Sequence, residues 1–315
     1  MIAASASAPG KIILFGEHAV VYGQPALAAP VACVQATARV EPAREGHWIE
    51  ARDIGRRYRL EAPRPNDPLA AAARLALQRL GLAEAPAFTL TVASSIPIAS
   101  GLGSGAAVST AIVRALAAAF GQQWRPAEVS ALVFETERLL HGTPSGIDNT
   151  VIAYAQPVWF IKGQAPEPFA VGAPFQLLIA DTGRPSPTRV TVGEVRAGWQ
   201  REPERYEVLF QAIGALARQA RGLIQAGQPA ALGALMTRNH ALLGELGVSS
   251  PELETLVAAA QTAGALGAKL SGGGRGGNLI ALVTAETAAG VEAALCQAGA
   301  ARVITTTIEK TPAAG

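Results

Sequence analysis

The segment from Ser94 to Ala111 reads SSIPIASGLGSGAAVSTA, and it passes from a strand pattern through a glycine-rich turn into a helix pattern. We call Pro97–Ala106 the first glycine turn. Glycines at 101, 103 and 105 let the backbone approach an anion without interference from Cβ atoms. The N-terminus of the following helix adds unpaired N–H groups and a partial positive charge. The segment therefore predicts a cradle for phosphate, with a tight turn that binds nothing as the alternative.

Two common nucleotide-binding motifs do not fit this segment. It lacks the Gly-Lys-Ser/Thr ending of a Walker A loop, and it lacks a GxGxxG in a Rossmann context. Ser100 and Ser104 offer hydroxyl groups to a phosphate or to its magnesium ion. The phosphate site is thus predicted from the glycines and the helix start.

A carboxylate on the next helix is the candidate metal ligand. The pattern predicts a helix over Pro126–His141, and Glu137 falls on the same face as its apolar residues, whereas Glu135 falls on the opposite face. A buried carboxylate is costly unless it is paired, hydrogen-bonded or bound to a cation. Glu137 is therefore predicted to meet a metal. Asp148 follows in TPSGIDN, where a helix N-cap or an Asx-turn is the alternative to a catalytic role.

The stretch KIILFGEHAVVYGQPA, Lys11–Ala26, places charged residues at both ends of a core strand. Residues 12–15 are all apolar, with Lys11 before them and Glu17 and His18 soon after. Solvated strand ends are the ordinary explanation. Together with the other clusters, these residues predict that the strand ends mark the rim of an active cleft.

A second glycine-rich stretch lies near the C-terminus, in GAKLSGGGRGGNLIALV. We call Gly272–Gly277 the second glycine turn. Such a turn either wraps a polyphosphate closely or forms a flexible hairpin. Arg275 within it either contacts phosphate or faces solvent. One glycine turn in each half of the chain indicates a ligand held between two domains.

Composition restricts the class of protein. The chain has 315 residues, 50% of them hydrophobic, which suggests roughly two domains. A net charge of +2 with 16% charged residues gives no basic field for nucleic acid. Four scattered histidines lack metal-ligand spacing.

No signal peptide or membrane-length apolar run is visible. Cys33 and Cys296 are predicted to be buried free thiols, with a disulfide as the alternative. We expect a soluble, cytoplasmic protein.

The elements alternate in both halves. Strands are predicted over Lys11–Phe15, between Cys33 and Leu60, and in AFTLTVASS; a helix over Asp67–Leu82 begins with Asp67 as N-cap. After the proline-rich stretch at 154–175, the pattern gives the strand QLLIADTG, helices to residue 265, and the strands NLIALV and RVITTTIE around a last helix. We place the domain boundary near 170, giving domains 1–170 and 171–315.

Taken together, these motifs resemble a known family. PGKIILFGEHAVVYG, PIASGLGSGAA and KLSGGGRGGN are similar, in order, to the three signature motifs of the GHMP kinases. Within that family, FGEHAVVYG, HGTPSGIDN and NHALLGELGVSS look most like the mevalonate kinase branch. The resemblance implies an α+β fold of two domains, the second ferredoxin-like, with the active site in the cleft between them. It also implies transfer of the ATP γ-phosphoryl group to the 5-hydroxyl of mevalonate.

Carried over position by position, the resemblance implies roles for single residues. Asp148 matches the catalytic aspartate, which would accept or orient the hydroxyl proton. Lys11 matches the active-site lysine, which would pair with Asp148 to hold it ionised and would stabilise the transferred charge. The phosphates of ATP would lie on the first glycine turn, at Pro97, Ser100, Gly101, Leu102, Gly103, Ser104, Gly105 and Ala106. Mg²⁺ would be held by Glu137 and Ser104. The substrate pocket would be lined by Glu17, His18 and Thr188.

Two departures from the family pattern and several alternatives remain open. Many members carry consecutive serines where this chain has Ser104 followed by Gly105, and Arg275 stands where small residues are usual. Other GHMP kinases are the nearest alternatives: phosphomevalonate kinase needs basic residues that the motifs do not show, homoserine kinase lacks a matching aspartate, and galactokinase has a different opening motif. A non-catalytic ATP-binding paralogue and a homodimer are also left open.

Overall fold

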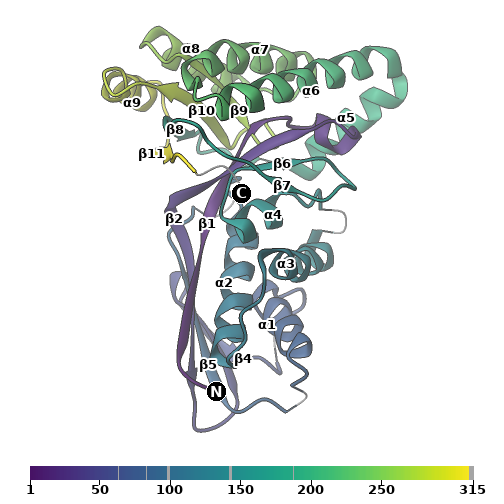
Figure 1. The fold of residues 1–315 in the computed structure, drawn as a ribbon, viewed down its shortest axis with the longest axis vertical. Coiled ribbons are helices and arrows are strands. Elements are labelled where there is room, and N and C mark those ends of the chain that lie inside the picture. The colour runs from purple at the N-terminus through teal and green to yellow at the C-terminus, as the bar shows by residue number, and fades with distance from the viewer. Residues whose placement is uncertain (63, 83, 98–99, 142–143, 187, 312–315) are drawn as a thin grey trace. The chain divides into compact units, whose positions relative to one another are not determined.

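A computed structural model describes residues 1–315 except 63, 83, 98–99, 142–143, 187 and 312–315 (Figure 1). The chain forms two compact units. The first contains Met1–Lys11, Ala32–Ile98 and Leu102–Ala155; the second contains Ile12–Val31, Ala99–Gly101 and Gln156–Gly315. The second unit therefore contains the chain from residue 156 onward, together with two short segments from the N-terminal half. The domain boundary near 170 stays a prediction.

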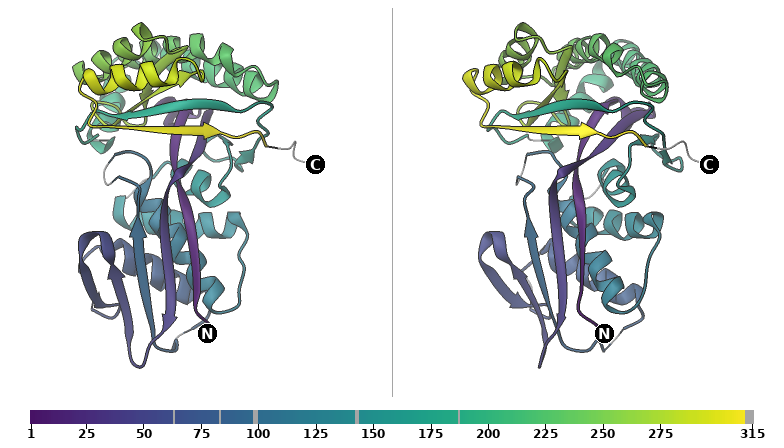
Figure 2. Two further views of the ribbon diagram at one scale, coloured as in Figure 1. Left: turned by 90° about the vertical axis from the view of Figure 1, so that its left-hand side faces the viewer. Right: turned by 60° about the vertical axis from the view of Figure 1, so that its left-hand side comes forward.

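The first unit is a sheet with helices on one face (Figure 2). Its strands are the N-terminal part of β1 (Ala4–Phe15), the C-terminal part of β2 (Ala26–Pro42), β3 (His47–Ala51), β4 (Arg56–Arg59) and β5 (Phe88–Ser94). Residues 36–42 of β2 pair antiparallel with β5, β3 pairs parallel with β5, and β4 pairs antiparallel with β3. Its helices are α1 (Pro68–Arg79), α2 (Ser104–Ala119), α3 (Pro126–His141) and α4 (Ile147–Tyr154), with the short η2 (Arg52–Ile54) before β4.

Local sequence explains several of these elements. Phe88, Leu90 and Val92 of β5 are buried, as their alternation predicts. Helix α1 begins where its capping residue predicts, because Asp67 Oδ1 accepts hydrogen bonds from the N–H groups of Leu69 (3.0 Å) and Ala70 (3.1 Å). These parts of the fold follow from short-range patterns.

The second unit is built on an antiparallel four-stranded sheet in the order β11-β8-β10-β9, with helices over one face. The strands are β8 (Phe175–Asp181), β9 (Gly267–Ser271), β10 (Asn278–Val283) and β11 (Arg302–Ile308). The helices are α5 (Thr188–Arg201), α6 (Pro203–Gln225), α7 (Leu232–Glu245), α8 (Pro251–Thr262) and α9 (Ala288–Gln297). The unit also contains β6 (Val158–Phe160), which pairs with residues 26–28 of β2, and β7 (Glu167–Pro168), η1 (Ala19–Tyr22) and η3 (Pro229–Ala231).

Helix α7 lies unusually close to β9 because two glycines face each other. A Cβ atom added to Gly267 would lie 2.1 Å from the carbonyl oxygen of Gly233, and one added to Gly233 would lie 2.1 Å from that of Leu266. Neither position has room for a side chain. Next to this close approach, the N–H of Leu270 on β9 donates to Nδ1 of His240 on α7 (3.3 Å).

The structure adds one strand to the predicted fold and corrects one expectation. The sequence analysis did not predict β9 as a strand, although Gly267–Ser271 is fully buried in the sheet. Cys33 and Cys296 are free, as expected, but both are exposed rather than buried. Cys33 lies on an outward-facing part of β2, and Cys296 follows the buried Leu295 on the outer side of α9. Within the part of the chain that the structure describes, no helix has both the length and the apolar character of a membrane span.

Candidate active site

The first unit brings together the lysine and the aspartate that the sequence analysis paired. Lys11 Nζ lies 3.0 Å from Asp148 Oδ1. The lysine side chain is only 5% exposed, whereas that of the aspartate is 37% exposed. The arrangement is therefore an accessible carboxylate with a buried cation behind it. Such a carboxylate can accept a proton from a bound hydroxyl group, while the cation stabilises negative charge next to it.

Helix α4 fixes the position of Asp148. The helix begins after Gly146, whose φ of 89° favours glycine, and Asp148 is its second residue rather than its cap. The next residue, Asn149, is buried and donates from Nδ2 to the backbone oxygen (3.1 Å) and to Oγ (2.9 Å) of Ser130 on α3. Asp148 is therefore held by a helix that is itself tied to α3.

Gly103 leaves the space through which the Lys11 side chain passes. Its φ is 75°, and a Cβ atom there would lie 2.9 Å from both Lys11 Cγ and Ile152 Cδ1. Ile152 stands four residues after Asp148, so both lie on the same face of α4. The backbone N–H of Lys11 also donates to the carbonyl oxygen of Leu102 (2.9 Å). A side chain at Gly103 would push on the lysine that reaches Asp148.

The N-terminus of α2 and the carboxylate of Glu137 lie side by side in the same unit. Gly103 is the N-cap of α2, no side chain caps the helix, and Ser104 is its first residue. Glu137 Oε1 is 3.4 Å from the position that a Cβ atom on Gly105 would take. The backbone predicted to bind phosphate and the carboxylate predicted to bind a metal ion therefore lie at the same end of α2. Leu102 and Ala106 are buried beneath it, and Pro97 is half-buried.

Two residues of the first glycine turn, Ser100 and Gly101, belong to the second unit. Ser100 is buried, and its carbonyl oxygen accepts a hydrogen bond from Asn278 Nδ2 at the start of β10. Gly101 is exposed and has a φ of 82°. Within the second unit, this contact ties Ser100 to the residue that follows the second glycine turn.

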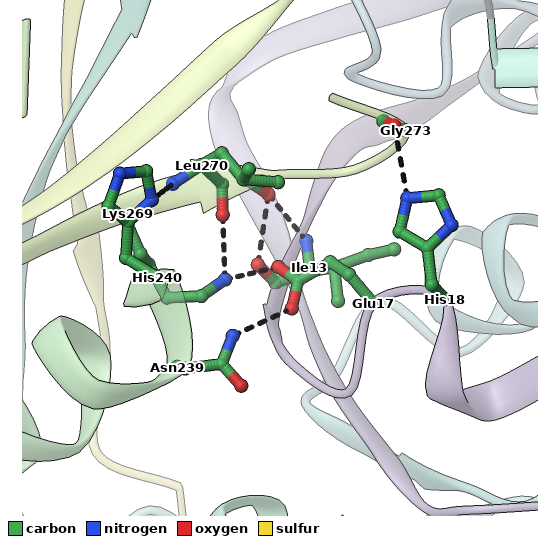
Figure 3. A network of polar contacts seen from close by, with 9 residues as sticks. Ile13, Glu17, His18, Asn239, His240, Lys269, Leu270 and Gly273 are labelled. Atoms are coloured by element: carbon green, nitrogen blue, oxygen red, sulfur yellow. Dashed lines mark hydrogen bonds and ion pairs between the residues drawn. The ribbon is translucent and has the colours of Figure 1, made fainter. Parts of the chain in front are cut away.

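In the second unit, Glu17 and His18 have different polar partners (Figure 3). The side chain of Glu17 is fully buried and forms an ion pair with Lys269, while Asn239 Nδ2 donates to its second oxygen (3.3 Å). His18 Nε2 lies 3.0 Å from the carbonyl oxygen of Gly273. A carbonyl only accepts, so Nε2 carries the proton. That Glu17 and His18 line a substrate pocket stays a prediction.

Burial determines the charge of His18. It lowers the pKa of the ring to about 4, against an opposing contribution from the hydrogen bond to Gly273 and with a smaller lowering by Arg275. The ring is therefore neutral near pH 7, with Nδ1 as its acceptor atom. Nδ1 forms no hydrogen bond with any residue that the structure describes.

The third predicted substrate residue, Thr188, lies beside the same glycine. It is exposed and begins α5, and a Cβ atom on Gly273 would lie 2.5 Å from its Oγ1. Ser186 Oγ nearby donates to the carbonyl oxygen of Gly274 (2.9 Å). His18 and Thr188 therefore both adjoin Gly273, which the sequence analysis did not anticipate.

The structure also answers the open question about Arg275. Its guanidinium forms an ion pair with Glu194 on α5, and its Nε donates to the carbonyl oxygen of Gly247 (3.1 Å). Arg275 thus links α5 to the turn after α7.

Sequence reasoning missed Lys269, which is the counter-ion of Glu17. A lysine between the apolar residues of GAKLS was the available signal, because a charge in a buried strand needs a partner. The identity of that partner was not readable, since it lies 252 positions away in the chain.

Two family models match the chain. The model described as GHMP kinases N terminal domain matches residues 68–156, and the one described as GHMP kinases C terminal matches residues 220–301. The chain is 37% identical over 320 residues to the mevalonate kinase of Thermococcus sibiricus, covering 95% of each protein. It is 37% identical over 298 residues to that of Pyrococcus furiosus, covering 88% of each.

A solved structure agrees with these relatives. The crystal structure of L. major mevalonate kinase in complex with R-mevalonate matches with a TM-score of 0.87 and 29% identity, over 98% of this chain and 97% of that one. The likeness extends across both units, so the expected two-domain α+β fold is confirmed.

Proposed function

Because the chain belongs to the GHMP kinase family, and relatives over most of its length are mevalonate kinases, we propose that it phosphorylates mevalonate. It transfers the γ-phosphoryl group of ATP to the 5-hydroxyl, giving 5-phosphomevalonate and ADP in isoprenoid precursor synthesis. The observation that carries the catalytic assignment is the 3.0 Å pair of Lys11 and Asp148.

Residues of this chain supply positioning and charge stabilisation, which dominate phosphoryl transfer. Asp148 orients the 5-hydroxyl and takes its proton as the oxygen attacks the γ-phosphorus. Lys11 stabilises the Asp148 carboxylate and the charge on the transferred group. The first glycine turn and the uncapped N-terminus of α2 bind the phosphates of ATP through backbone N–H groups.

The residues present fit a magnesium ion at the start of α2. Mg²⁺ in kinases is usually bound by one or two carboxylates together with substrate phosphates, and Glu137 with Ser104 offers one carboxylate and one hydroxyl there. No group of three or more His, Cys, Asp and Glu residues suited to a metal occurs among the described residues. A bound Mg²⁺ would neutralise phosphate charge.

A conservative change at Glu137 tests this assignment. We expect Glu137→Gln to raise the magnesium concentration needed for half-maximal activity by about tenfold, because one charged ligand is lost (~1.4 kcal/mol). Magnesium titrations at fixed ATP measure this, and Glu135→Gln, an exposed carboxylate on the same helix paired with Arg138, is the control. Equal magnesium requirements in the two variants would remove Glu137 from the metal site.

A matched pair of glycines tests the first glycine turn. Gly103 and Gly121 have φ values of 75° and 72°, but a Cβ atom at Gly121 would meet nothing within 4 Å. Both alanine variants carry the same backbone strain, and only Gly103→Ala presses on Lys11. We expect Gly103→Ala to lower kcat/KM by at least about tenfold (~1.4 kcal/mol) and Gly121→Ala to keep it. Steady-state kinetics decide, and similar losses in both variants would contradict the packing argument.

The function itself is tested with a substrate panel. The purified protein is assayed for ADP release with magnesium-ATP and, separately, mevalonate, phosphomevalonate, homoserine and galactose. We expect turnover with mevalonate alone and 5-phosphomevalonate as the product by mass spectrometry. The Asp148→Asn variant controls for contaminating kinases. Turnover with another of these alcohols and none with mevalonate would replace the assignment.

Cytoplasmic location and a homodimer are the remaining parts of the proposal. The absence of a membrane-spanning helix from the described residues supports the first. Light scattering of the purified protein tests the second.

A further inference from the structure

Within the second unit, β9 and the turn after it hold residues 13–18 through alternate positions (Figure 3). Ser271 Oγ donates to the carbonyl oxygen of Ile13 (2.9 Å) and accepts from its N–H (3.1 Å). Two positions earlier, Lys269 pairs with Glu17. Two positions later, the carbonyl oxygen of Gly273 accepts from His18. Residues 269, 271 and 273 therefore hold the segment that ends in His18.

The ion pair at the centre of this contact is completely buried. The side chains of Lys269 and Glu17 are each 0% exposed. Lys269 Nζ also donates to the carbonyl oxygen of Leu270 (2.7 Å), and Asn239 donates to Glu17. Burial lowers the pKa of Lys269, while the charge and hydrogen bond of Glu17 oppose that lowering. A buried pair of this kind is often no more stabilising than well-packed apolar residues, so stability alone does not explain it.

The backbone next to the pair is held in an unusual conformation. His18 has a φ of 59°, in the left-handed region that non-glycine residues rarely adopt. Such a conformation persists only where the surroundings hold it. On one side of His18 is the Lys269–Glu17 pair, and its own ring is held by Gly273. The conformation thus depends on contacts from the strand and turn at 269–273.

We propose that Lys269 is a positioning residue for substrate binding: through Glu17 it fixes the backbone of Gly16–His18, so that the His18 ring, held at Nε2 by Gly273, presents Nδ1 as acceptor to a hydroxyl group of mevalonate. This inference rests on the proposed function. An unprotonated Nδ1 accepts from an O–H group and cannot bind the substrate carboxylate. Lys269 lies behind Glu17 and acts only through it.

The test removes both charges together. Lys269→Met alone leaves a buried, unpaired carboxylate and is expected to unfold easily. The double variant Glu17→Gln/Lys269→Met keeps the shapes without the charges, and its fold is checked by thermal unfolding. The control is Glu202→Gln/Arg205→Met, which removes an exposed ion pair from the same unit. Kinetics with varied mevalonate and with varied ATP separate the two Michaelis constants.

We expect the double variant to raise the KM for mevalonate by about three- to tenfold, the effect of one neutral hydrogen bond, with the KM for ATP unchanged. ¹⁵N NMR of His18, assigned by comparison with His18→Gln, should show the pKa rising from about 4 toward its ordinary value of 6.5 as the ring gains solvent. A folded double variant with wild-type KM values and an unchanged His18 pKa overturns the proposal. If the proposed function is wrong, the wild-type protein will not phosphorylate mevalonate. The His18 pKa measured by NMR in the double variant would still test the positioning role of Lys269.

Discussion

Asp148→Asn should lower kcat for mevalonate phosphorylation by about 10²- to 10⁴-fold, the range that general-base assistance supplies. Asparagine keeps the shape of the side chain and can still accept a hydrogen bond from Lys11, which lies 3.0 Å away. It cannot take the proton of the 5-hydroxyl. ATP affinity should change little, because Asp148 has no assigned contact with the phosphates. Steady-state kinetics and equilibrium binding of ATP measure the two effects separately.

Variants of Lys11, the ion-pair partner of Asp148, test whether the two residues act together. Lys11→Met should also lower kcat, and the double variant should be scarcely slower than the slower single variant, because residues that act as a unit are not additive. The matched control is Glu128→Gln, a carboxylate in the first turn of α3 whose Oε1 lies 2.6 Å from Arg79. It should keep wild-type kcat. Full activity in Asp148→Asn, or strictly multiplicative losses in the double variant, would contradict joint action.

The largest effect on stability is expected at the glycine contact between α7 and β9. Gly267→Ala would place a methyl group 2.1 Å from the carbonyl oxygen of Gly233 and 2.6 Å from its Cα atom, so helix and strand must separate. Overpacking of this kind typically costs about 1–3 kcal/mol, and occasionally more. Chemical denaturation should show that loss in the free energy of unfolding.

A second glycine serves as the control for this measurement. Gly290 lies within α9, is exposed, and has nothing within 4 Å of an added Cβ atom. Gly290→Ala should stabilise the protein by roughly 0.5–1 kcal/mol, since alanine is the better helix former. If Gly267→Ala instead matches wild type, the close approach of α7 to β9 is not needed for folding.

Short-range patterns were enough to predict much of the fold. Asp67 caps α1, and Phe88, Leu90 and Val92 alternate into the core, because both features depend on residues within a few positions of each other. The pairing of Lys11 with Asp148 was also predicted, through the resemblance to a family. Its geometry is now visible, and its catalytic role stays a prediction for kinetics.

Long-range features could not be predicted in the same way. Strand β9 is short and ends at a glycine run, so its pattern looked like a loop; its place in the sheet comes from pairing with β10. The burial of Lys269 depends on Glu17, which no local pattern near either residue reveals. The exposure of Cys33 was mispredicted because apolar neighbours do not say which side of a strand faces the core.

Adjacent residues Lys11 and Ile12 fall in different compact units, and this constrains how the gene can change by recombination. A crossover near residue 156 would exchange most of the second unit without its residues 12–31 and 99–101. In the recombinant protein, Lys269 would come from one parent and Glu17 from the other. The buried ion pair would then join two residues that did not evolve together. The two units are interleaved in the gene, so a single crossover cannot exchange either one as a module.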